Sequence, residues 1–346
     1  MMSSALMPRQ TLFFLWAAFA LAPAAGVAGP FPTPTPRPTV TPTPTPLKLK
    51  TPGDRTLILA ADEHPTLGDH DRRYILHVPA AYDESRPAPV VIVLHGEGGT
   101  AKGAMYETGW THQADRSGFL AVFPEGTAPD SSNPPRFLGD PQTWNDGSGR
   151  FFSGENRVDD IAFLKEILDD LKDRLTVDER RVFVVGFSNG GSLAFRAGIE
   201  MGARIAAIAS VAGCLWVKSP KLYSPVSLLY VIGSEDPLAP VEGGRVRLPF
   251  GGVEVRPPAS DVVAKWAEML RCPAKPQRLR APEGFGARRY GPGRSGSEVV
   301  FYVIDGMGHT WPGGRRLLPE RVVGKTTDKI KANEVIWQFF RDHPKK

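Results

Sequence analysis

Residues 182–191 read VFVVGFSNGG and contain the pattern G-x-S-x-G at positions 186–190. The run 182–185 is β-branched and aromatic, as is typical of a strand buried on both faces, and residues 191–195 (GSLAF) begin a helical segment. A serine on a sharp strand-to-helix turn projects its hydroxyl into a cleft, and flanking glycines let neighbouring backbone approach. The stretch therefore predicts a nucleophile elbow with Ser188 at its tip. The alternative is a glycine-rich turn with a purely structural role.

Strand-like and helix-like segments alternate on both sides of this turn. The predicted strands are 73–78, 90–94, 120–123, 208–211, 228–232 and 299–304, and the predicted helices are 160–171, 193–199 and 332–340. The segment 73–78 alternates as an edge strand does, and 278–298 is interpreted as a hairpin or an excursion. Strands separated by helices predict an α/β fold, with a mostly parallel, doubly wound sheet and helices on both faces.

The N-terminal part of the chain differs in composition from the rest. Residues 1–28 combine Arg9, an apolar run (LFFLWAAFAL) and small residues (APAAGVA), which together are typical of a cleaved export signal. Residues 29–54 include a Pro-Thr repeat that favours polyproline II and predicts a semi-rigid linker. We therefore expect a single catalytic domain over 55–346, in a protein that is secreted or periplasmic after cleavage.

Charge and hydropathy exclude other classes of function. The 346 residues include 42 Lys and Arg against 37 Asp and Glu, a net charge of +5. No basic run stands out, so we expect no nucleic-acid partner. No segment after the signal is apolar for long enough to span a bilayer. We expect a monomer.

A nucleophilic serine needs a histidine and an acid later in the chain, in the order that α/β-hydrolases use. His309 follows a predicted strand in a glycine-rich loop, whereas His343 lies in the charged C-terminal tail. Asp236 directly follows the strand 228–232 and is favoured as the acid over its neighbour Glu235. Asp305 also lies between the serine and the histidine, but it is close to His309 on the same strand end.

Stabilising an oxyanion requires two backbone N–H donors. One is expected from Asn189, the residue after the nucleophile. The other is expected from Glu97, in the loop His-Gly-Glu-Gly-Gly-Thr at 95–100 that follows the strand 90–94. His95 itself is interpreted as structural.

Six blocks, in this order, carry a resemblance to a known family: HGEGGT (95–100), WN (144–145), VDDIAFL (158–164), GFSNG (186–190), DP (236–237) and GHTWPGG (308–314). Together they resemble the secreted esterases that include polyhydroxybutyrate depolymerase-like and feruloyl esterase-like α/β-hydrolases. The resemblance runs from about residue 73 to 340, and the last block is more specific than the elbow. It implies a triad of Ser188, Asp236 and His309.

Such a triad implies hydrolysis of carboxylic esters through an acyl-enzyme, with no metal and no organic cofactor. The expected substrates are small, oligomeric or polysaccharide-linked esters, among them hydroxyalkanoate oligomers and feruloyl or acetyl esters. Two alternatives remain open. One is an acyltransferase with the same triad, and the other is a noncatalytic binding protein on a hydrolase scaffold.

Two pairs of residues have both a functional and a structural interpretation. Trp144 and Trp311 are expected to form a wall for an acyl or aryl group, or else to pack in the core. Cys214 and Cys272 are the two cysteines of the chain. Export would permit a disulfide between them, and the alternative is two free thiols.

Overall fold

The computed structural model describes residues 50–248, 252–280 and 283–346. The predicted export signal (1–28) and most of the predicted linker (29–54) lie outside these ranges. The first strand, β1 (Gly53–Leu59), begins inside the segment predicted as linker. Its side chains alternate between exposed and buried, and Leu57 and Leu59 are buried, so this segment belongs to the fold.

One ten-stranded sheet organises the domain, in the order β1-β2-β4-β3-β5-β6-β7-β12-β11-β10. The other strands of this sheet are β2 (Arg72–Val78), β3 (Ala88–Leu94), β4 (Leu120–Pro124), β5 (Val177–Phe187), β6 (Ala207–Val211), β7 (Ser227–Gly233), β10 (Gln277–Arg278), β11 (Phe285–Tyr290) and β12 (Val299–Ile304). The strands from β4 to β12 in this order are mutually parallel, and the strands outside them pair antiparallel. This is the predicted mostly parallel, doubly wound sheet of an α/β-hydrolase.

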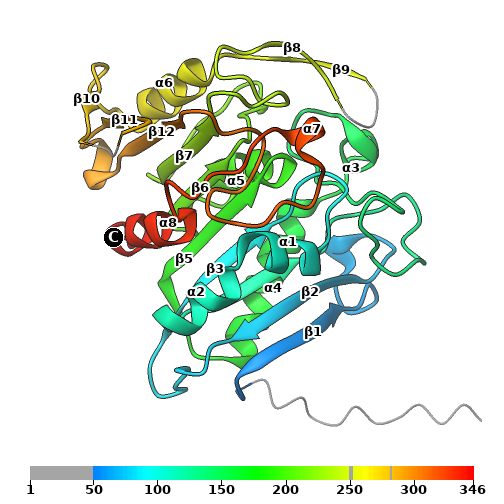
Figure 1. The fold of residues 1–346 in the computed structure, drawn as a ribbon. Coiled ribbons are helices and arrows are strands. Elements are labelled where there is room, and N and C mark those ends of the chain that lie inside the picture. Colours follow the sequence, from blue (N-terminus) through cyan, green and yellow to red (C-terminus); the bar gives the residue numbers. More distant parts are fainter. Residues whose placement is uncertain (1–49, 249–251, 281–282) are drawn as a thin grey trace, which may run out of the picture. The chain divides into compact units, whose positions relative to one another are not determined.

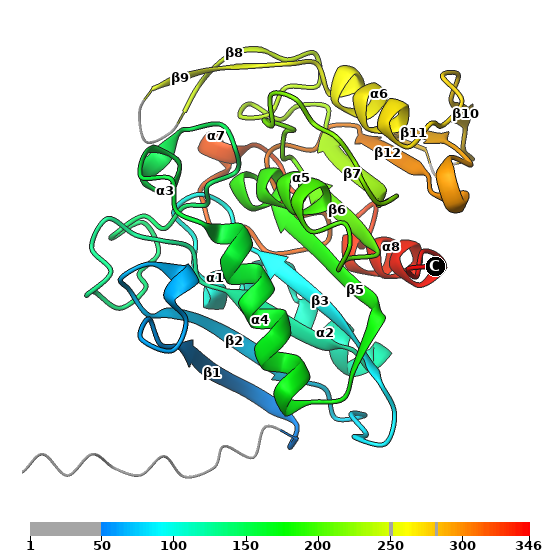
Figure 2. The same cartoon turned by 180° about the vertical axis from the view of Figure 1, so that it is seen from behind.

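The helices form layers on both faces of the sheet (Figures 1 and 2). They are η1 (Pro65–Leu67), α1 (Ala101–Thr108), α2 (Trp110–Ser117), α3 (Phe151–Glu155), α4 (Asp160–Arg174), α5 (Asn189–Glu200), α6 (Ala259–Met269), η2 (Arg294–Gly296), α7 (Glu320–Val323) and α8 (Ala332–Asp342). On one face, the Phe340 ring of α8 stacks on Phe183 of β5 at 4.5 Å. On the other, Phe195 of α5 meets Tyr230 of β7 edge to face at 5.6 Å. These aromatic contacts fix each layer to the sheet.

Two predictions about the sheet edges have different outcomes. The segment 73–78 was expected at an edge, but β2 lies inside the sheet between β1 and β4. The prediction was wrong because no strand was predicted before residue 73, whereas β1 covers that edge. The hairpin or excursion predicted over 278–298 is confirmed as a hairpin, because β11 pairs antiparallel with β12 and β10 pairs antiparallel with β11.

A separate hairpin lies outside the main sheet, and the sequence analysis did not anticipate it. It pairs β8 (Gly244–Arg247) with β9 (Val253–Arg256) and reaches toward α3 across one end of the molecule (Figure 1). Its Glu254 side chain is buried while Val253 and Val255 are exposed. The hairpin therefore has an inner and an outer face, and the inner face contributes to the site described below.

None of the helices in the described ranges is both long enough and apolar enough to cross a membrane.

Candidate active site

Ser188 occupies a strained turn between β5 and α5. Its backbone has φ 53° and ψ −119°, in the half of conformational space that L-residues rarely adopt. The two glycines of the motif are required by space. A Cβ on Gly186 would lie 2.2 Å from the Gly190 carbonyl oxygen, and a Cβ on Gly190 would lie 2.4 Å from that of His95. The two glycines thus permit the sharp turn that the sequence pattern predicted. The Ser188 side chain lines a cavity.

His309 and Asp236 lie together at the carboxyl ends of β12 and β7. The Nδ1 atom of His309 is 2.8 Å from Oδ2 and 3.0 Å from Oδ1 of Asp236. Both side chains are buried. Asp236 Oδ1 also accepts hydrogen bonds from the backbone N–H groups of Leu238 and Ala239, at 2.8 and 2.7 Å. The acid is therefore fixed by its own loop and in turn orients the imidazole.

The other acids considered from the sequence do not contact His309. Glu235 and Asp305 are exposed. His343 bonds instead to the Phe339 carbonyl, and its ring faces Glu298. His309 lines the same cavity as Ser188. No hydrogen bond joins the Ser188 hydroxyl to any residue of the described ranges. Catalytic hydrogen bonds of this kind often tighten only when substrate is bound.

The loop after β3 lies beside the nucleophile. A Cβ on Gly96 would lie 3.4 Å from Ser188 Cβ. The backbone N–H groups of Glu97 and Asn189 donate to no acceptor within the described part of the chain, and both residues line the cavity. Two free donors that line the same cavity as the serine are candidates for an oxyanion hole.

The buried His95 side chain forms hydrogen bonds that hold this loop in place. Its Nδ1 lies 2.7 Å from the Gly96 carbonyl oxygen, and its Nε2 accepts from the Gly126 N–H at 3.0 Å. Burial lowers the pKa of His95 to about 4, so the ring is neutral near pH 7. Across residues 50–248, 252–280 and 283–346, no three His, Cys, Asp or Glu side chains are grouped so as to hold a metal ion.

The cavity has a volume of about 890 Å³, which includes space open to solvent. Its apolar lining includes Phe137, Phe151, Phe187, Leu238 and Leu248. Its charged lining includes Glu97, Glu107, Arg150, Glu254 and Arg256. Burial raises the pKa of Glu97 to about 7, and the nearby Arg150 guanidinium opposes that shift. The cavity therefore joins an aromatic surface suited to an acyl or aryl group with several ionisable side chains.

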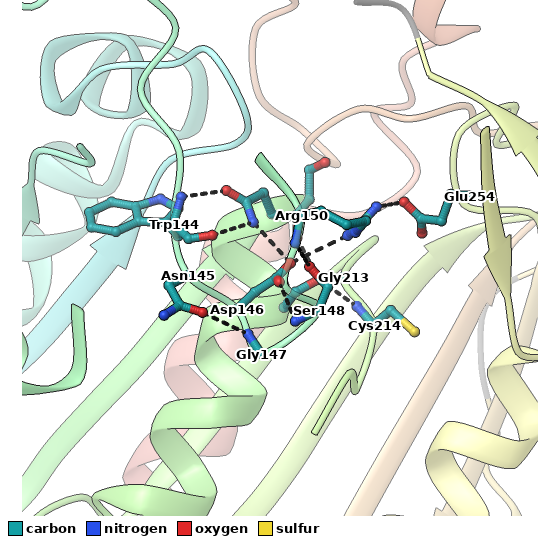
Figure 3. A network of polar contacts seen from close by, with 12 residues as sticks. Trp144, Asn145, Asp146, Gly147, Ser148, Arg150, Gly213, Cys214 and Glu254 are labelled. Carbon is teal, nitrogen blue, oxygen red and sulfur yellow. Dashed lines mark hydrogen bonds and ion pairs between the residues drawn. The ribbon is translucent and has the colours of Figure 1, made fainter. Parts of the chain in front are cut away.

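A chain of polar contacts links the residue after the nucleophile to the β8–β9 hairpin (Figure 3). Asn189 Oδ1 accepts from the Trp144 N–H at 2.8 Å, and Asn189 Nδ2 donates to Asp146 Oδ2 at 2.9 Å. Arg150 lies 3.5 Å from the same carboxylate oxygen and forms an ion pair with Glu254. The chain thus holds the Asn189 side chain and fastens the hairpin beside the cavity.

Four charged residues of this site were not predicted from the sequence: Asp146, Arg150, Glu254 and Arg256. The WND sequence at 144–146 was noted only for its tryptophan and asparagine. Arg256 binds the carbonyl oxygens of Leu238, Ala212 and Gly213 and pairs with Glu254 at 3.2 Å. Apart from Glu254, which lies in the same strand, these partners are 18 to 44 residues away in sequence, so no local pattern indicated them.

Trp144 and Trp311 do not form the expected substrate wall. Both are almost fully buried and neither lines the cavity. The Trp144 indole N–H donates to the His95 carbonyl at 2.9 Å, and that of Trp311 donates to Asn333 Oδ1 at 2.9 Å. The structural alternative therefore holds, and phenylalanines supply the aromatic surface instead.

The expected Cys214–Cys272 disulfide is absent, and both cysteines are free. Cys214 follows the carboxyl end of β6, where its N–H bonds to Ser192 Oγ. Cys272 follows α6 and lies 4.0 Å from the Ser297 carbonyl oxygen, just before the start of β12. Because β6 and β12 run parallel in one sheet, the two thiols lie at opposite ends of the strands. This separation does not allow a disulfide, which requires Cα atoms within about 7 Å of each other.

Comparison with protein families gives a match between residues 80–246 and a family described as Phospholipase/Carboxylesterase. Among individual proteins, NocK of Nocardia uniformis subsp. tsuyamanensis, named as an esterase, is 30% identical in an alignment of 288 positions that covers 78% of each chain. Feruloyl esterase C of Emericella nidulans is 26% identical over 190 residues, covering 53% of this chain and 63% of that protein.

Among solved structures, the acetyl xylan esterase of Aspergillus awamori superposes with a TM-score of 0.51 at 14% sequence identity. The match covers 74% of this chain and 94% of that one. At this identity the likeness bears on the fold alone, and it agrees with the sheet topology.

Proposed function

The chain belongs to a carboxylesterase family of α/β-hydrolases and is a carboxylic-ester hydrolase, and on that premise we propose that Ser188, His309 and Asp236 are its catalytic triad. The observation that carries the proposal is the Asp236–His309 pair, whose imidazole lines the same cavity as Ser188. The family membership gives the reaction, and this geometry supports the assignment of residues.

In the proposed mechanism, neutral His309 accepts the Ser188 proton at Nε2 while Ser188 Oγ attacks the ester carbonyl carbon. The N–H groups of Glu97 and Asn189 hold the resulting oxyanion. Asp236 keeps the proton of His309 on Nδ1 and stabilises the imidazolium. The imidazolium then protonates the departing alcohol, and water, activated by the same ring, hydrolyses the acyl-enzyme.

The cavity and the relatives support a choice of substrate class. Phe137, Phe151 and Phe187 offer an aromatic surface for the acyl side of the ester. The similar proteins include enzymes named feruloyl esterase and bifunctional acetylxylan esterase/xylanase. We therefore propose feruloyl or acetyl esters, or short hydroxyalkanoate oligomers, as substrates. We also propose that residues 1–28 direct export of the enzyme.

A labelling experiment tests the nucleophile. The purified protein is treated with a fluorophosphonate, digested and analysed by mass spectrometry, and hydrolysis of p-nitrophenyl acetate is followed in parallel. Modification of Ser188 with loss of turnover is expected. Ser188→Ala should lose nearly all activity, whereas Ser260→Ala, on the exposed surface of α6, should match the wild type. Wild-type turnover by Ser188→Ala would refute the assignment.

A further inference from the structure

Glu107 is a carboxyl group in the catalytic cavity that the proposed mechanism does not use. It lies in the last turn of α1 with 8% of its surface exposed, and it lines the cavity together with Ser188. Its carboxyl forms no hydrogen bond and no ion pair with any residue that the structure describes. A carboxyl that borders the substrate cavity and has no partner within the protein is available to hydrogen-bond a ligand there.

The geometry of α1 places this carboxyl on the cavity side. Ala104 lies three residues earlier on the same face of the helix and also lines the cavity. Next to that face, a Cβ on Gly103 would lie 3.6 Å from Leu317, another lining residue. The adjacent Tyr106 points away and is 54% exposed. Glu107 also borders a second hollow next to Tyr106, where its backbone oxygen accepts from the Arg315 N–H. Its low exposure and its place on the same face as Ala104 put the side chain on the side of the catalytic cavity.

The surroundings of Glu107 decide which group it can bind. Burial alone raises its pKa to about 8, and no charged neighbour contributes. Glu97 differs, because Arg150 and Asp146 act on it. A neutral carboxylic acid both donates and accepts a hydrogen bond, and enzymes use such acids as donors in apolar sites. A neutral hydroxyl group matches it, whereas a cation would require the buried acid to ionise.

We propose that Glu107 is a specificity-determining residue that contacts a hydroxyl group on the acyl or the alcohol part of the ester substrate. The proposal rests on the proposed function, because it takes the cavity that contains Ser188 as the place where the ester binds. Unlike the triad assignment, it concerns the choice among esters and not the chemistry of cleavage. A site built to bond a hydroxyl discriminates against the analogue that lacks it, because its polar group is then left unpaired.

The test uses two pairs of esters that differ by hydroxyl groups. One pair is p-nitrophenyl 3-hydroxybutyrate and p-nitrophenyl butyrate, and the other is glycerol monobutyrate and propyl butyrate. For each pair, kcat/KM is measured with the wild type, Glu107→Leu, Glu107→Gln and the control Glu63→Gln, which alters an exposed carboxylate. The wild type and Glu63→Gln should prefer the hydroxylated member of at least one pair by about tenfold or more.

Glu107→Leu should lose that preference, so that its ratio of kcat/KM for the hydroxylated over the hydroxyl-free ester falls toward one. Glu107→Gln, whose amide still bonds, should keep part of the preference. Should Glu107→Leu fail to fold, Glu107→Ala replaces it in the same comparison. A wild type without preference in either pair, or a preference that survives Glu107→Leu, overturns the proposal. Failure of the triad assignment has a different signature, because it appears as activity retained by Ser188→Ala.

Discussion

Asp236 holds the His309 ring through Nδ1, at 2.8 and 3.0 Å from its two carboxylate oxygens. The carboxylate is itself held by two backbone N–H groups of its own loop. The orientation of the imidazole is therefore set before any substrate arrives, with Nε2 left free to act as the base.

Asp236→Asn should reduce kcat by about three to four orders of magnitude, because an amide that donates toward Nδ1 would favour the wrong tautomer of His309. The measurement is kcat for p-nitrophenyl acetate, with circular dichroism to verify folding. Glu235→Gln is the matched control, because it alters the adjacent acid, which is exposed. Greater damage from Glu235→Gln than from Asp236→Asn would show that the acid is assigned one residue too late.

The part of the site that the sequence predicted is the part encoded by local patterns. The strand-serine-helix arrangement, the acid after β7 and the histidine after β12 each follow one buried strand, and strands of this kind are recognisable from consecutive apolar residues. The alternation of strands and helices likewise predicted the sheet and its two helix layers.

The charged lining could not be predicted, because its contacts join distant segments. Arg150 lies after β4, and its partner Glu254 lies in β9, about a hundred residues later. Trp144 is the opposite case, a residue for which the sequence suggested a substrate contact that the structure does not show. Its position near the motifs suggested a substrate contact, but whether an indole faces a cavity or the core depends on packing from several elements at once.

Asp146→Ala should lower both stability and turnover. The change removes one buried acceptor from the amide of Asn189, which keeps the Trp144 carbonyl, and one from the guanidinium of Arg150, which keeps Glu254. We expect a loss of about 1–3 kcal/mol in the free energy of unfolding. The loss is limited to this range because the Arg150 side chain is 26% exposed, so solvent screens part of its attraction to Asp146. Urea unfolding measures that loss, and kcat should also fall because Asn189 follows the nucleophile. Asp130→Ala, which removes an exposed carboxylate, is the control. An unchanged unfolding midpoint for Asp146→Ala would contradict the structural role given to this network.

The two cysteines should be thiols in the native protein. Burial raises the pKa of Cys214 and that of Cys272 to about 11, so both thiols should react slowly with Ellman's reagent at pH 8 and fully after denaturation. Adding reductant should leave Tm unchanged. A fall in Tm with reductant, or two thiols that stay unreactive in denaturant until reduced, would mean that the export compartment forms a bond that the structure lacks.

The buried acid at position 107 should make the stability of the enzyme depend on pH in a defined direction. Burial raises the pKa of Glu107 from its ordinary value of 4.5 to about 8. Between these values the folded state retains a proton that the unfolded state has released, so the free energy of unfolding falls as pH rises from about 4.5 to about 8. The stabilisation is fully present below the lower value and is lost through the upper one.

Glu107→Gln removes this titration, so the stability of the variant should increase relative to that of the wild type as pH rises. The difference in unfolding free energy between the variant and the wild type should grow by about 1–4 kcal/mol from pH 5 to pH 9 and level off above about pH 8. Urea unfolding at five pH values gives the difference directly, and other groups such as Glu97 cancel in it because both proteins contain them. Glu63→Gln should give a difference curve that is flat over the same range, since that carboxylate is exposed. Parallel curves for the wild type and Glu107→Gln would show that Glu107 ionises as an exposed glutamate does, and the neutral acid proposed for the cavity would then not exist.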